Sequence, residues 1–297
     1  MYTNFPLYPT GIFTNTDYPT QVDNTNVVYA DLINALRAEI QACFNELGVL
    51  PKRSYTDVNA RLNAISIAAG MEIADPISQL KMNDKAATKV VIDSMGNNNG
   101  TAQQNTVDIS VAGKINDALE FNGVDDYIDL GYNSNLKPTA EITISVWAKP
   151  ATLNPYAWVI SKPRGSGIWN DYGIRAYSTS SSFILTTLNN NISLTGSDGQ
   201  SVGVWRHIAA TYDGSYVRLY INGVEVDSDP ATGAIQYDDT ESYKYIYLGE
   251  WRGPSVGNEV FGGAIDDVRI YNFALSDKEV GALWNNGDGT EEQNPLP

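Results

Sequence analysis

Apolar and polar residues alternate through positions 205–226 (WRHIAATYDGSYVRLYINGVEV), and two turn dipeptides divide this stretch into three short segments. From Val217 to Ile221 every second residue is apolar, which is the period of a strand with one buried face. Asp213-Gly214 and Asn222-Gly223 both tolerate the positive φ of tight turns between antiparallel strands. The stretch therefore predicts a three-stranded meander, whose apolar face needs a second sheet to cover it.

Similar short segments, separated by Gly, Asn, Asp and Pro turns, continue over residues 80–286. Strands are predicted at 118–122, 126–130, 141–150, 157–163, 182–188, 243–249 and 263–272. Ser276-Asp277-Lys278-Glu279 has the sequence of a capping box and predicts a short helix near the end of this region. The expected fold class is an all-β sandwich, followed by an acidic tail over residues 287–297.

The N-terminal third has a different pattern. Residues 1–29 contain three prolines and a glycine, which predict an extended attachment arm, with a disordered tail as the alternative. Residues 30–70 predict two short helices, and residues 71–79 a linker. The first helix carries an apolar seam of the kind that packs between identical subunits, with a hairpin packed on the sandwich as the alternative. The seam consists of Ile33, Leu36, Ile40, Cys43 and Leu47.

Charge and composition exclude several classes of function. The 297 residues carry a formal net charge of −16 without any basic run, so binding to nucleic acid or to an anionic membrane is not expected. The single cysteine excludes an intrachain disulfide, and no apolar run reaches the length of a transmembrane span. The N-terminus lacks the apolar core of a signal peptide, so we expect any release from a cell to occur without one.

Five stretches in order along the chain resemble the laminin G-like, concanavalin A-like jelly roll. This resemblance covers about two thirds of the chain and implies a twelve- to fourteen-stranded sandwich, but it says little about function because the fold serves lectins, adhesion modules, enzymes and spacers. The stretches are LKMNDKAATKVVIDSMGNNNGT (80–101), ALEFNGVDDYIDLG (118–131), ITISVWAKP (142–150), the meander, and GAIDDVRIYNFALSDKEVGALW (263–284).

The segment YPTQVDNTNVVYADLINALRAEI, followed by NELGVLPKRSYTDVNARLNAI, is similar to the leading segment of many tailed-phage virion proteins. In those proteins such a segment attaches a fibre or decoration protein to the particle and oligomerises it. The resemblance implies other virion proteins as partners, a homotrimer, and assembly in the host cytoplasm into the virion. It agrees with the lack of a signal peptide.

A structural Ca²⁺ ion is one candidate for bound chemistry, because members of the jelly-roll family often hold one. By strand parity, Asp126 and Asp266 should face the sandwich interior, where a carboxylate must be paired, hydrogen-bonded or metal-bound. The loop around Asp93 and Asn97 offers further oxygen ligands. The alternative is that Asp126 and Asp266 accept hydrogen bonds from backbone amides or from an arginine such as Arg269.

A carbohydrate-binding patch is predicted from two tryptophans in Gly-rich loops. Sugar rings stack on exposed aromatic faces, and flanking polar groups bind their hydroxyls. The alternative is that these aromatic residues anchor their own loops on the sandwich. The predicted patch consists of Trp169, Asn170, Tyr172, Trp251 and Arg252.

Catalysis is the less favoured interpretation. Glu225, Asp227 and Asp229 alternate, so we expect them to share one face of a strand. The pattern is similar to the E-x-D-x-E signature of jelly-roll glucanases, but the third residue is Asp. A retaining pair needs carboxyl groups about 5–5.5 Å apart, so a bulge would be required within a strand. His207, the only histidine, has no second histidine or cysteine near it in sequence, and a structural role is expected.

The sequence as a whole predicts a non-enzymatic virion protein whose jelly roll faces outward and binds a host surface glycan. Two alternatives stay open: a glycan-degrading enzyme that uses Glu225, and a structural decoration protein that binds nothing.

Overall fold

The computed structural model describes residues 75–151, 154, 156–165, 170–176, 180–197, 199, 202–252 and 259–292. The predicted arm, the helical segment with its apolar seam, and Trp169 lie outside the described residues.

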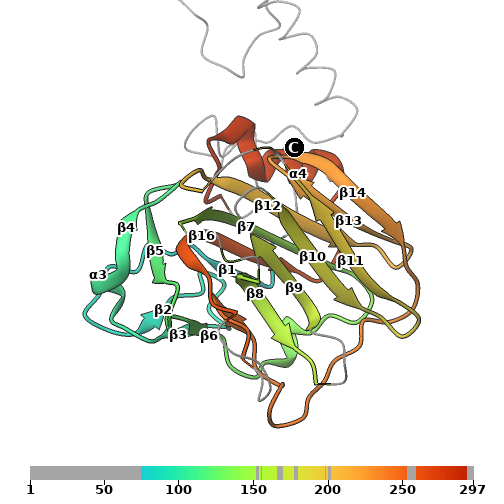
Figure 1. Ribbon diagram of the computed structural model, residues 1–297, viewed down its shortest axis with the longest axis horizontal. Coiled ribbons are helices and arrows are strands. Elements are labelled where there is room, and N and C mark those ends of the chain that lie inside the picture. The colour runs from blue at the N-terminus through green and yellow to red at the C-terminus, as the bar shows by residue number, and fades with distance from the viewer. Residues whose placement is uncertain are drawn as a thin grey trace, which may run out of the picture. The chain divides into compact units, whose positions relative to one another are not determined.

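Two antiparallel eight-stranded sheets make up the described part of the chain, which confirms the predicted sandwich (Figure 1). Sheet A has the order β14-β13-β12-β7-β16-β5-β4, and β1 also pairs with β16. Its strands are β1 (Ser78–Leu80), β4 (Ser110–Ala112), β5 (Asp117–Asn122), β7 (Ile142–Pro150), β12 (Arg206–Tyr212), β13 (Tyr216–Ile221), β14 (Val224–Pro230) and β16 (Gly262–Tyr271).

Sheet B has the order β11-β10-β9-β8-β15-β6-β3-β2. Its strands are β2 (Val90–Val91), β3 (Gly100–Ala102), β6 (Ile128–Asp129), β8 (Trp158–Pro163), β9 (Asn170–Ala176), β10 (Ser181–Thr186), β11 (Asn191–Gly196) and β15 (Tyr247–Leu248). The helical elements are α3 (Thr106–Ile109), η1 (Ser134–Leu136), α4 (Asp277–Trp284) and η2 (Asn285–Gly287). No helix among the described residues is both long and apolar enough to cross a membrane.

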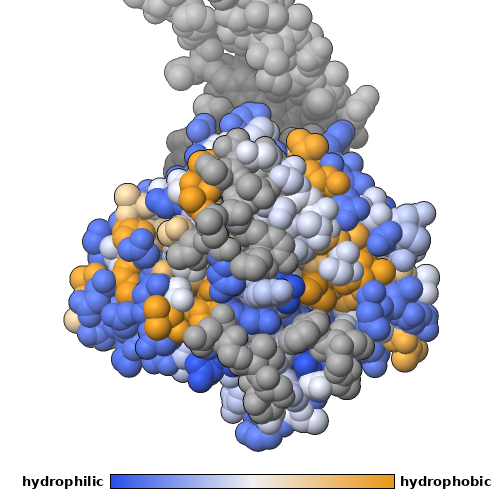
Figure 2. Space-filling view, in the orientation of Figure 1, coloured by the Kyte–Doolittle hydropathy of each residue, from blue (hydrophilic) through white to orange (hydrophobic). Residues whose placement is uncertain are grey.

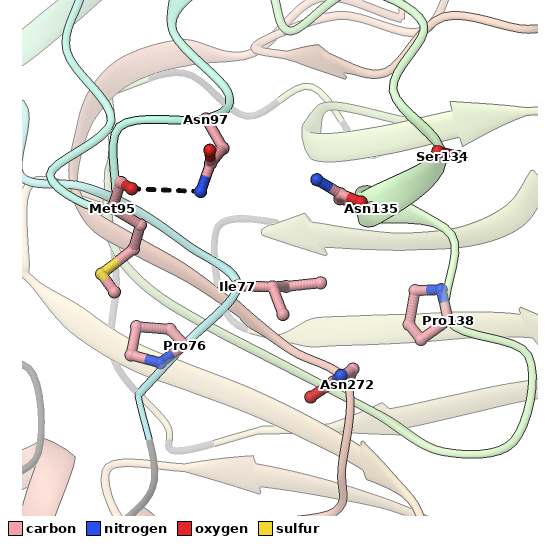
Figure 3. A pocket seen from close by; sticks show the side chains of 8 residues that line it. All are labelled: Pro76, Ile77, Met95, Asn97, Ser134, Asn135, Pro138 and Asn272. Carbon is pink, nitrogen blue, oxygen red and sulfur yellow. Dashed lines mark hydrogen bonds between the residues drawn. The ribbon is translucent and has the colours of Figure 1, made fainter.

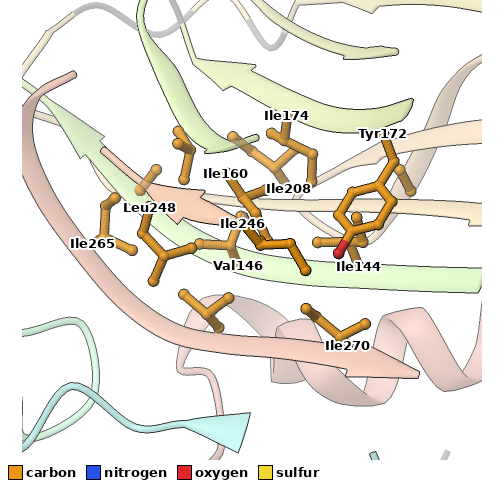
Figure 4. Packing of buried hydrophobic residues seen from close by; sticks show 14 of the residues in the cluster. Ile144, Val146, Ile160, Tyr172, Ile174, Ile208, Ile246, Leu248, Ile265 and Ile270 are labelled. Carbon is orange, nitrogen blue, oxygen red and sulfur yellow. The ribbon is translucent and has the colours of Figure 1, made fainter. Parts of the chain in front are cut away.

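The main hydrophobic core lies between the two sheets, where alternate residues of each strand meet (Figure 4). Branched aliphatic residues dominate it because they fit the pleated surface of a strand and lose little freedom there. Ile144, Val146, Ile208, Ile265 and Ile270 come from sheet A, and Ile160, Tyr172, Ile174 and Leu248 come from sheet B.

The predicted meander is confirmed as β12, β13 and β14. At its second turn Asn222 and Gly223 have φ values of 51° and 74°, the left-handed conformation that such a two-residue turn requires. The capping box is also confirmed. The Ser276 hydroxyl accepts a hydrogen bond from the Glu279 amide, and the Glu279 carboxylate accepts one from the Ser276 amide. The helix that follows, α4, packs Val280 and Leu283 on the outer face of sheet A.

Strand parity gave the wrong orientation for Asp266. The pairing of β16 with β7 shifts between Asp266 and Arg269, and Asp267 has a φ of 39°. This bulge inserts an extra residue, so Ile265 and Val268 both reach the core although they are three residues apart. Asp266 pairs with Trp147, which lies outside the core cluster, and therefore faces away from the sandwich interior.

A second bulge separates the carboxylates of β14. Tyr220 pairs with Glu225 whereas the preceding Leu219 pairs with Asp227, so one residue of β14 is extra. Leu219 points into the main core and Tyr220 packs with α4 on the outer face. Glu225 and Asp227 therefore lie on opposite faces, and the expectation that Glu225, Asp227 and Asp229 share one face is wrong.

Candidate functional site

Two of the predicted sugar-binding residues are buried. Asn170 and Tyr172 are 0% exposed. The Tyr172 ring belongs to the main core, and its hydroxyl donates to the Leu136 carbonyl at 2.9 Å. Burial raises the pKa of Tyr172, so this hydroxyl stays protonated as a donor. Neither residue presents a surface on which a sugar could stack, so they do not contribute to an exposed patch.

Trp251 is also buried, at 5% exposed, in a small cluster with Trp158 and Ile184 on the outer face of sheet B. The Trp158 indole N–H donates to Glu259, and the Arg175 guanidinium lies 4.0 Å from the centre of the Trp158 ring. The burial of Trp251 in this cluster fits the alternative stated above, in which a loop tryptophan anchors its own loop on the sandwich.

Arg252 is exposed and lines a pocket of about 420 Å³, here called the Arg252 pocket. The pocket joins one predicted sugar-binding residue, Arg252, to one predicted calcium ligand, Asp126. Its lining consists of Gln103, Gln104, Val124, Asp125, Asp126, Tyr127, Glu250 and Arg252.

The guanidinium of Arg252 is held in place from two sides. Its Nη1 donates to Glu250 Oε2 at 2.9 Å, and its centre lies 4.2 Å from the centroid of the Tyr127 ring. Tyr127 in turn packs edge-on against Tyr247, with ring centroids 5.9 Å apart. Burial raises the pKa of Glu250 above its usual 4.5, while Arg252 opposes that shift.

Asp126 also lines the Arg252 pocket and is 5% exposed. Its Oδ1 accepts from Gln104 Nε2 at 2.8 Å, and its Oδ2 accepts from the Asn122 backbone amide at 3.0 Å. The pocket therefore offers fixed carboxylate acceptors, carboxamides and a guanidinium donor, which are the groups that recognise the hydroxyls of a carbohydrate. The sequence did not point to Gln104, Tyr127 or Glu250, because they come from three separate segments without a shared motif.

A second pocket, of about 350 Å³, lies where β1 approaches the loop before β3, the helix η1 and the end of β16 (Figure 3). We call it the Asn135 pocket. It is lined by Pro76, Ile77, Met95, Asn97, Ser134, Asn135, Pro138 and Asn272. Of these residues, the sequence predicts a function only for Asn97, as a calcium ligand.

The predicted calcium ligands do not form one site. Within the described residues no three carboxylate, histidine or cysteine side chains come together as a metal-binding group. Asp93 Oδ1 accepts from the amides of Gln79 and Met95, and its Oδ2 accepts from three N–H groups of Asn97 and Asn98. N–H donors therefore occupy the lone pairs of Asp93 that a cation would need, and the loop around Asp93 does not fit Ca²⁺.

Asp266 is likewise bonded to the backbone. Its Oδ2 accepts from the amides of Lys114 and Ile115, each at 2.8 Å, while its Oδ1 has no hydrogen-bond partner. Burial, aided by the neighbouring Asp267, raises the pKa of Asp266 to about 8. For Asp126 and Asp266 the alternative of backbone amide donors is confirmed by these hydrogen bonds.

The groups considered for catalysis are engaged elsewhere. Glu225 lies 3.6 Å from Arg218 Nε, and Asp227 accepts from the Thr195 amide at 2.9 Å. His207 is 1% exposed and its Nε2 lies 2.8 Å from the Ser145 hydroxyl. Burial, together with the charge of Arg269, lowers the pKa of His207 to about 3, as expected for a histidine with a structural role.

Among the described residues, the surface shown in Figure 2 has no single dominant hydrophobic region. On this face, exposed hydrophobic residues form separate patches among hydrophilic ones. Two antiparallel eight-stranded sheets packed face to face define a β-sandwich of the jelly-roll type. Residues 122–281 match the family model described as the concanavalin A-like lectin/glucanases superfamily, Laminin_G_3, and the chain belongs to this family.

Curated relatives match only a short part of the chain. Pappalysin-1 from Mus musculus is 35% identical over 79 residues, which are 26% of this chain and 5% of that protein. Pappalysin-1 from Homo sapiens is 33% identical over the same length. The match therefore spans about one twentieth of the curated relatives.

Solved structures show the same fold at low identity. The binding domain of Paraclostridial Mosquitocidal Protein 1 has a TM-score of 0.55 and 19% identity, covering 72% of this chain and 52% of that one. Domain 4 of the arabinanase AbnA from Geobacillus stearothermophilus, solved with arabinotriose, has a TM-score of 0.52 and 23% identity. It covers 70% of this chain and 97% of that one. The receptor-binding domain of the botulinum neurotoxin C/D mosaic serotype has a TM-score of 0.52 and 16% identity, covering 71% and 51%.

Proposed function

We propose that the jelly roll is a carbohydrate-binding module that attaches a virion to glycans on a host surface. The observation that carries this proposal is the Arg252 pocket, in which a guanidinium, three carboxylates and two carboxamides converge beside a tyrosine ring. A sugar hydroxyl both donates and accepts hydrogen bonds, so neighbouring hydroxyls are matched by neighbouring carboxylate and guanidinium groups.

The structural relatives support this choice of ligand class. The arabinanase domain was solved with arabinotriose, and the mosquitocidal and botulinum proteins are described as binding and receptor-binding domains. The fold alone does not determine a ligand, so the proposal depends on the pocket and takes only its direction from these proteins.

The virion part of the proposal is supported by the N-terminal sequence. Residues 1–29 would attach the chain to other virion proteins, and the apolar seam from Ile33 to Leu47 would gather three copies into a homotrimer. Three weak sugar sites on one particle would then bind with much higher avidity than one.

A glycan array probed with the full-length protein tests the binding function. We expect Arg252→Ala to lose at least about tenfold in apparent affinity, because it removes charge-assisted hydrogen bonds worth roughly 1.5–3 kcal/mol. Arg218→Ala is the matched control, since Arg218 also pairs with a carboxylate and stacks on a tyrosine but lies on β13. Absence of any glycan signal would favour a decoration protein without a ligand, and equal losses in both variants would place the site elsewhere.

The mass of the purified protein in solution tests the role proposed for the N-terminal residues, which is to assemble a homotrimer. The contacts divide the chain after Glu72, so a truncated chain of residues 73–297 leaves the jelly roll whole. We expect a trimer for the full chain and a monomer for the truncated one. A truncated chain that stays trimeric would place assembly in the jelly roll.

The arrangement of β14 does not favour a glycosidase. Its bulge puts Glu225 and Asp227 on opposite faces, and Glu225 lies beside Arg218. Polysaccharide hydrolysis that is lost in Glu225→Gln would contradict our preference for binding over catalysis.

A further inference from the structure

The Asn135 pocket carries no charge in a strongly acidic protein. None of the eight described residues that line it is ionisable, although the chain has a net charge of −16. The Arg252 pocket, by contrast, has four ionisable groups with charge at neutral pH in its lining. A pocket without charge gives no advantage to an ionic ligand and penalises the desolvation of one, so the Asn135 pocket selects neutral ligands.

Three carboxamides face this pocket from three separate parts of the chain (Figure 3). Asn97 uses one N–H to bond the Met95 carbonyl at 3.1 Å. Within the described residues the exposed side chains of Asn135 and Asn272 make no hydrogen bond, so their donors and acceptors are available to a ligand. Each carboxamide offers a C=O acceptor and N–H donors in one plane, which is the pattern that pairs with another amide.

An apolar wall lies among these amides. The Ile77 side chain projects into the pocket between Asn97, Asn135 and Asn272, with Pro138 on one side and Met95 on the other (Figure 3). A methyl group carried by an amide would bury itself against Ile77 while the amide itself reached the asparagines. The pocket therefore combines amide recognition with contact for a small apolar group.

The walls are fixed before any ligand arrives. The Asn98 side chain donates to the Ile77 carbonyl at 3.0 Å, and Asn133 Nδ2 donates to the Asn97 carbonyl at 3.2 Å. Asn133 Oδ1 also accepts from the Asn135 amide at 2.9 Å, which begins η1. Asp93 holds the far side of the same loop through its amide bonds. These cross-links reduce the entropy that a ligand would otherwise have to offset.

The backbone next to the pocket is closed to a peptide that would add as a strand. The Ile77 amide donates to the Ile270 carbonyl at 2.8 Å, and the Ile77 carbonyl accepts from Asn98. The Gln79 amide and carbonyl are bonded to Asp93 and Ser94. Strand addition needs a free edge, so the observations favour a compact ligand. A volume of about 350 Å³ also lies at the small end of ligand pockets, which run from about 300 to 1,000 Å³.

We infer that the Asn135 pocket binds a neutral N-acetylated sugar residue, with its acetamido group among the three asparagines and the acetyl methyl group against Ile77. This site is separate from the Arg252 pocket and does not depend on the function proposed for it. It gives the jelly roll a second, charge-independent contact with a glycan.

Titration of the full-length protein with N-acetylglucosamine tests the inference, with glucose and glucosamine as matched sugars that lack the acetyl group. The side-chain amide signals of Asn97, Asn135 and Asn272 in nuclear magnetic resonance spectra are the direct measurement. We expect them to shift with the acetylated sugar and to stay in place with the other two. Because no lining residue titrates, the affinity should also be the same at pH 5 and pH 8 and at low and high salt.

Asn135→Ala and Asn272→Ala should each weaken N-acetylglucosamine about two- to tenfold, as expected for the loss of one neutral hydrogen bond. Asn191→Ala is the matched control, an exposed asparagine on β11 outside the pocket. Arg218→Ala on β13, which lines neither pocket, should leave this affinity unchanged. Equal binding of glucose, unmoved asparagine signals, or tighter binding of N-acetylprolinamide than of the sugar would each overturn the inference, the last in favour of a peptide ligand.

Discussion

Asp93 and Asp266 are both buried carboxylates that the sequence marked for calcium, yet their surroundings differ sharply. Asp93 is 1% exposed, and both of its oxygens accept N–H donors, from Gln79, Met95, Asn97 and Asn98. Asp266 is 0% exposed, accepts from two amides on one oxygen, and leaves the other oxygen without a partner beside Asp267.

The difference shows that the number of N–H donors decides what a buried carboxylate does. At Asp93 five N–H groups donate to the two oxygens, and the carboxylate organises the loop that forms one wall of the Asn135 pocket. At Asp266 burial, aided by Asp267, raises the pKa to about 8, and one oxygen has no donor. The first carboxylate is a scaffold for a binding site, while the second makes folding depend on pH.

The largest expected effect concerns the pH dependence of stability at Asp266. Its folded pKa of about 8 lies above its ordinary value of 3.8, so the folded chain binds the proton more tightly than the unfolded chain. The free energy of unfolding should therefore fall as pH rises from about 4 to about 8, by up to about 1.4 kcal/mol per pH unit. Asp266→Asn should remove the part of this slope above about pH 6, because burial also raises the pKa of Asp171 to about 6 and gives a slope of the same sign below that pH.

Urea denaturation at several pH values, on wild type and Asp266→Asn, provides the measurement. Asp229→Asn is a suitable control, because Asp229 is an exposed carboxylate on β14. A wild-type slope between about pH 6 and pH 8 that persists in Asp266→Asn would show that another group binds the proton.

Asp93→Ala should destabilise the protein by about 3 kcal/mol or more, because several N–H donors at the loop lose their acceptor. Asp229→Ala, on the exposed strand β14, should change the free energy of unfolding by less than about 0.5 kcal/mol. Asp93→Ala should also abolish the asparagine shifts with N-acetylglucosamine at the Asn135 pocket, since Asn97 loses its support. A stable variant with an intact pocket would mean that the other cross-links suffice.

Much of the fold could be predicted from the sequence, because local patterns specify it. The Asn222-Gly223 turn, the capping box at Ser276 and the long strands β7 and β16 all have signals within ten residues. The strands β2, β3 and β15 have only two or three residues each and were missed or predicted too long, because their pairing partners define them.

The candidate sites were harder to predict because bulges and distant contacts create them. A single bulge at Asp267 reversed the orientation assigned to Asp266, and parity cannot reveal an inserted residue. Two residues of the Arg252 pocket were predicted as functional: Arg252 as a sugar-binding residue and Asp126 as a calcium ligand. Asn135 and Asn272 carry no signal, since 137 residues of chain separate them and only the fold brings them together.

Two glycines, one beside Asp266 and one in the loop around Asp93, allow a further comparison of these two regions. A Cβ atom on Gly113 would lie 2.5 Å from the Asp117 carbonyl oxygen and 2.7 Å from Asp266 Oδ2. Gly113→Ala should therefore cost about 2 kcal/mol or more, because backbone next to Asp266 must move. Gly96, in the loop held by Asp93, has a φ of +83° and open space around it, so Gly96→Ala should cost only about 1 kcal/mol. Thermal unfolding of both variants tests the order, and an equal or larger loss at Gly96 would mean that the loop is more tightly packed than the region of Asp266.

Calcium should have the smallest effect. A cation bound at one hundred times its Kd would stabilise the fold by about 2.7 kcal/mol and raise the melting temperature by several degrees. At Asp93 the incoming ion would have to displace N–H donors from both oxygens, and at Asp266 it would meet two N–H donors and one free oxygen atom. We therefore expect millimolar Ca²⁺ or its removal by a chelator to shift the melting temperature by less than about 1 °C. A rise of several degrees that disappears in Asp93→Ala, but persists in Asp266→Asn, would place an ion in the loop and reverse the roles assigned to these two carboxylates.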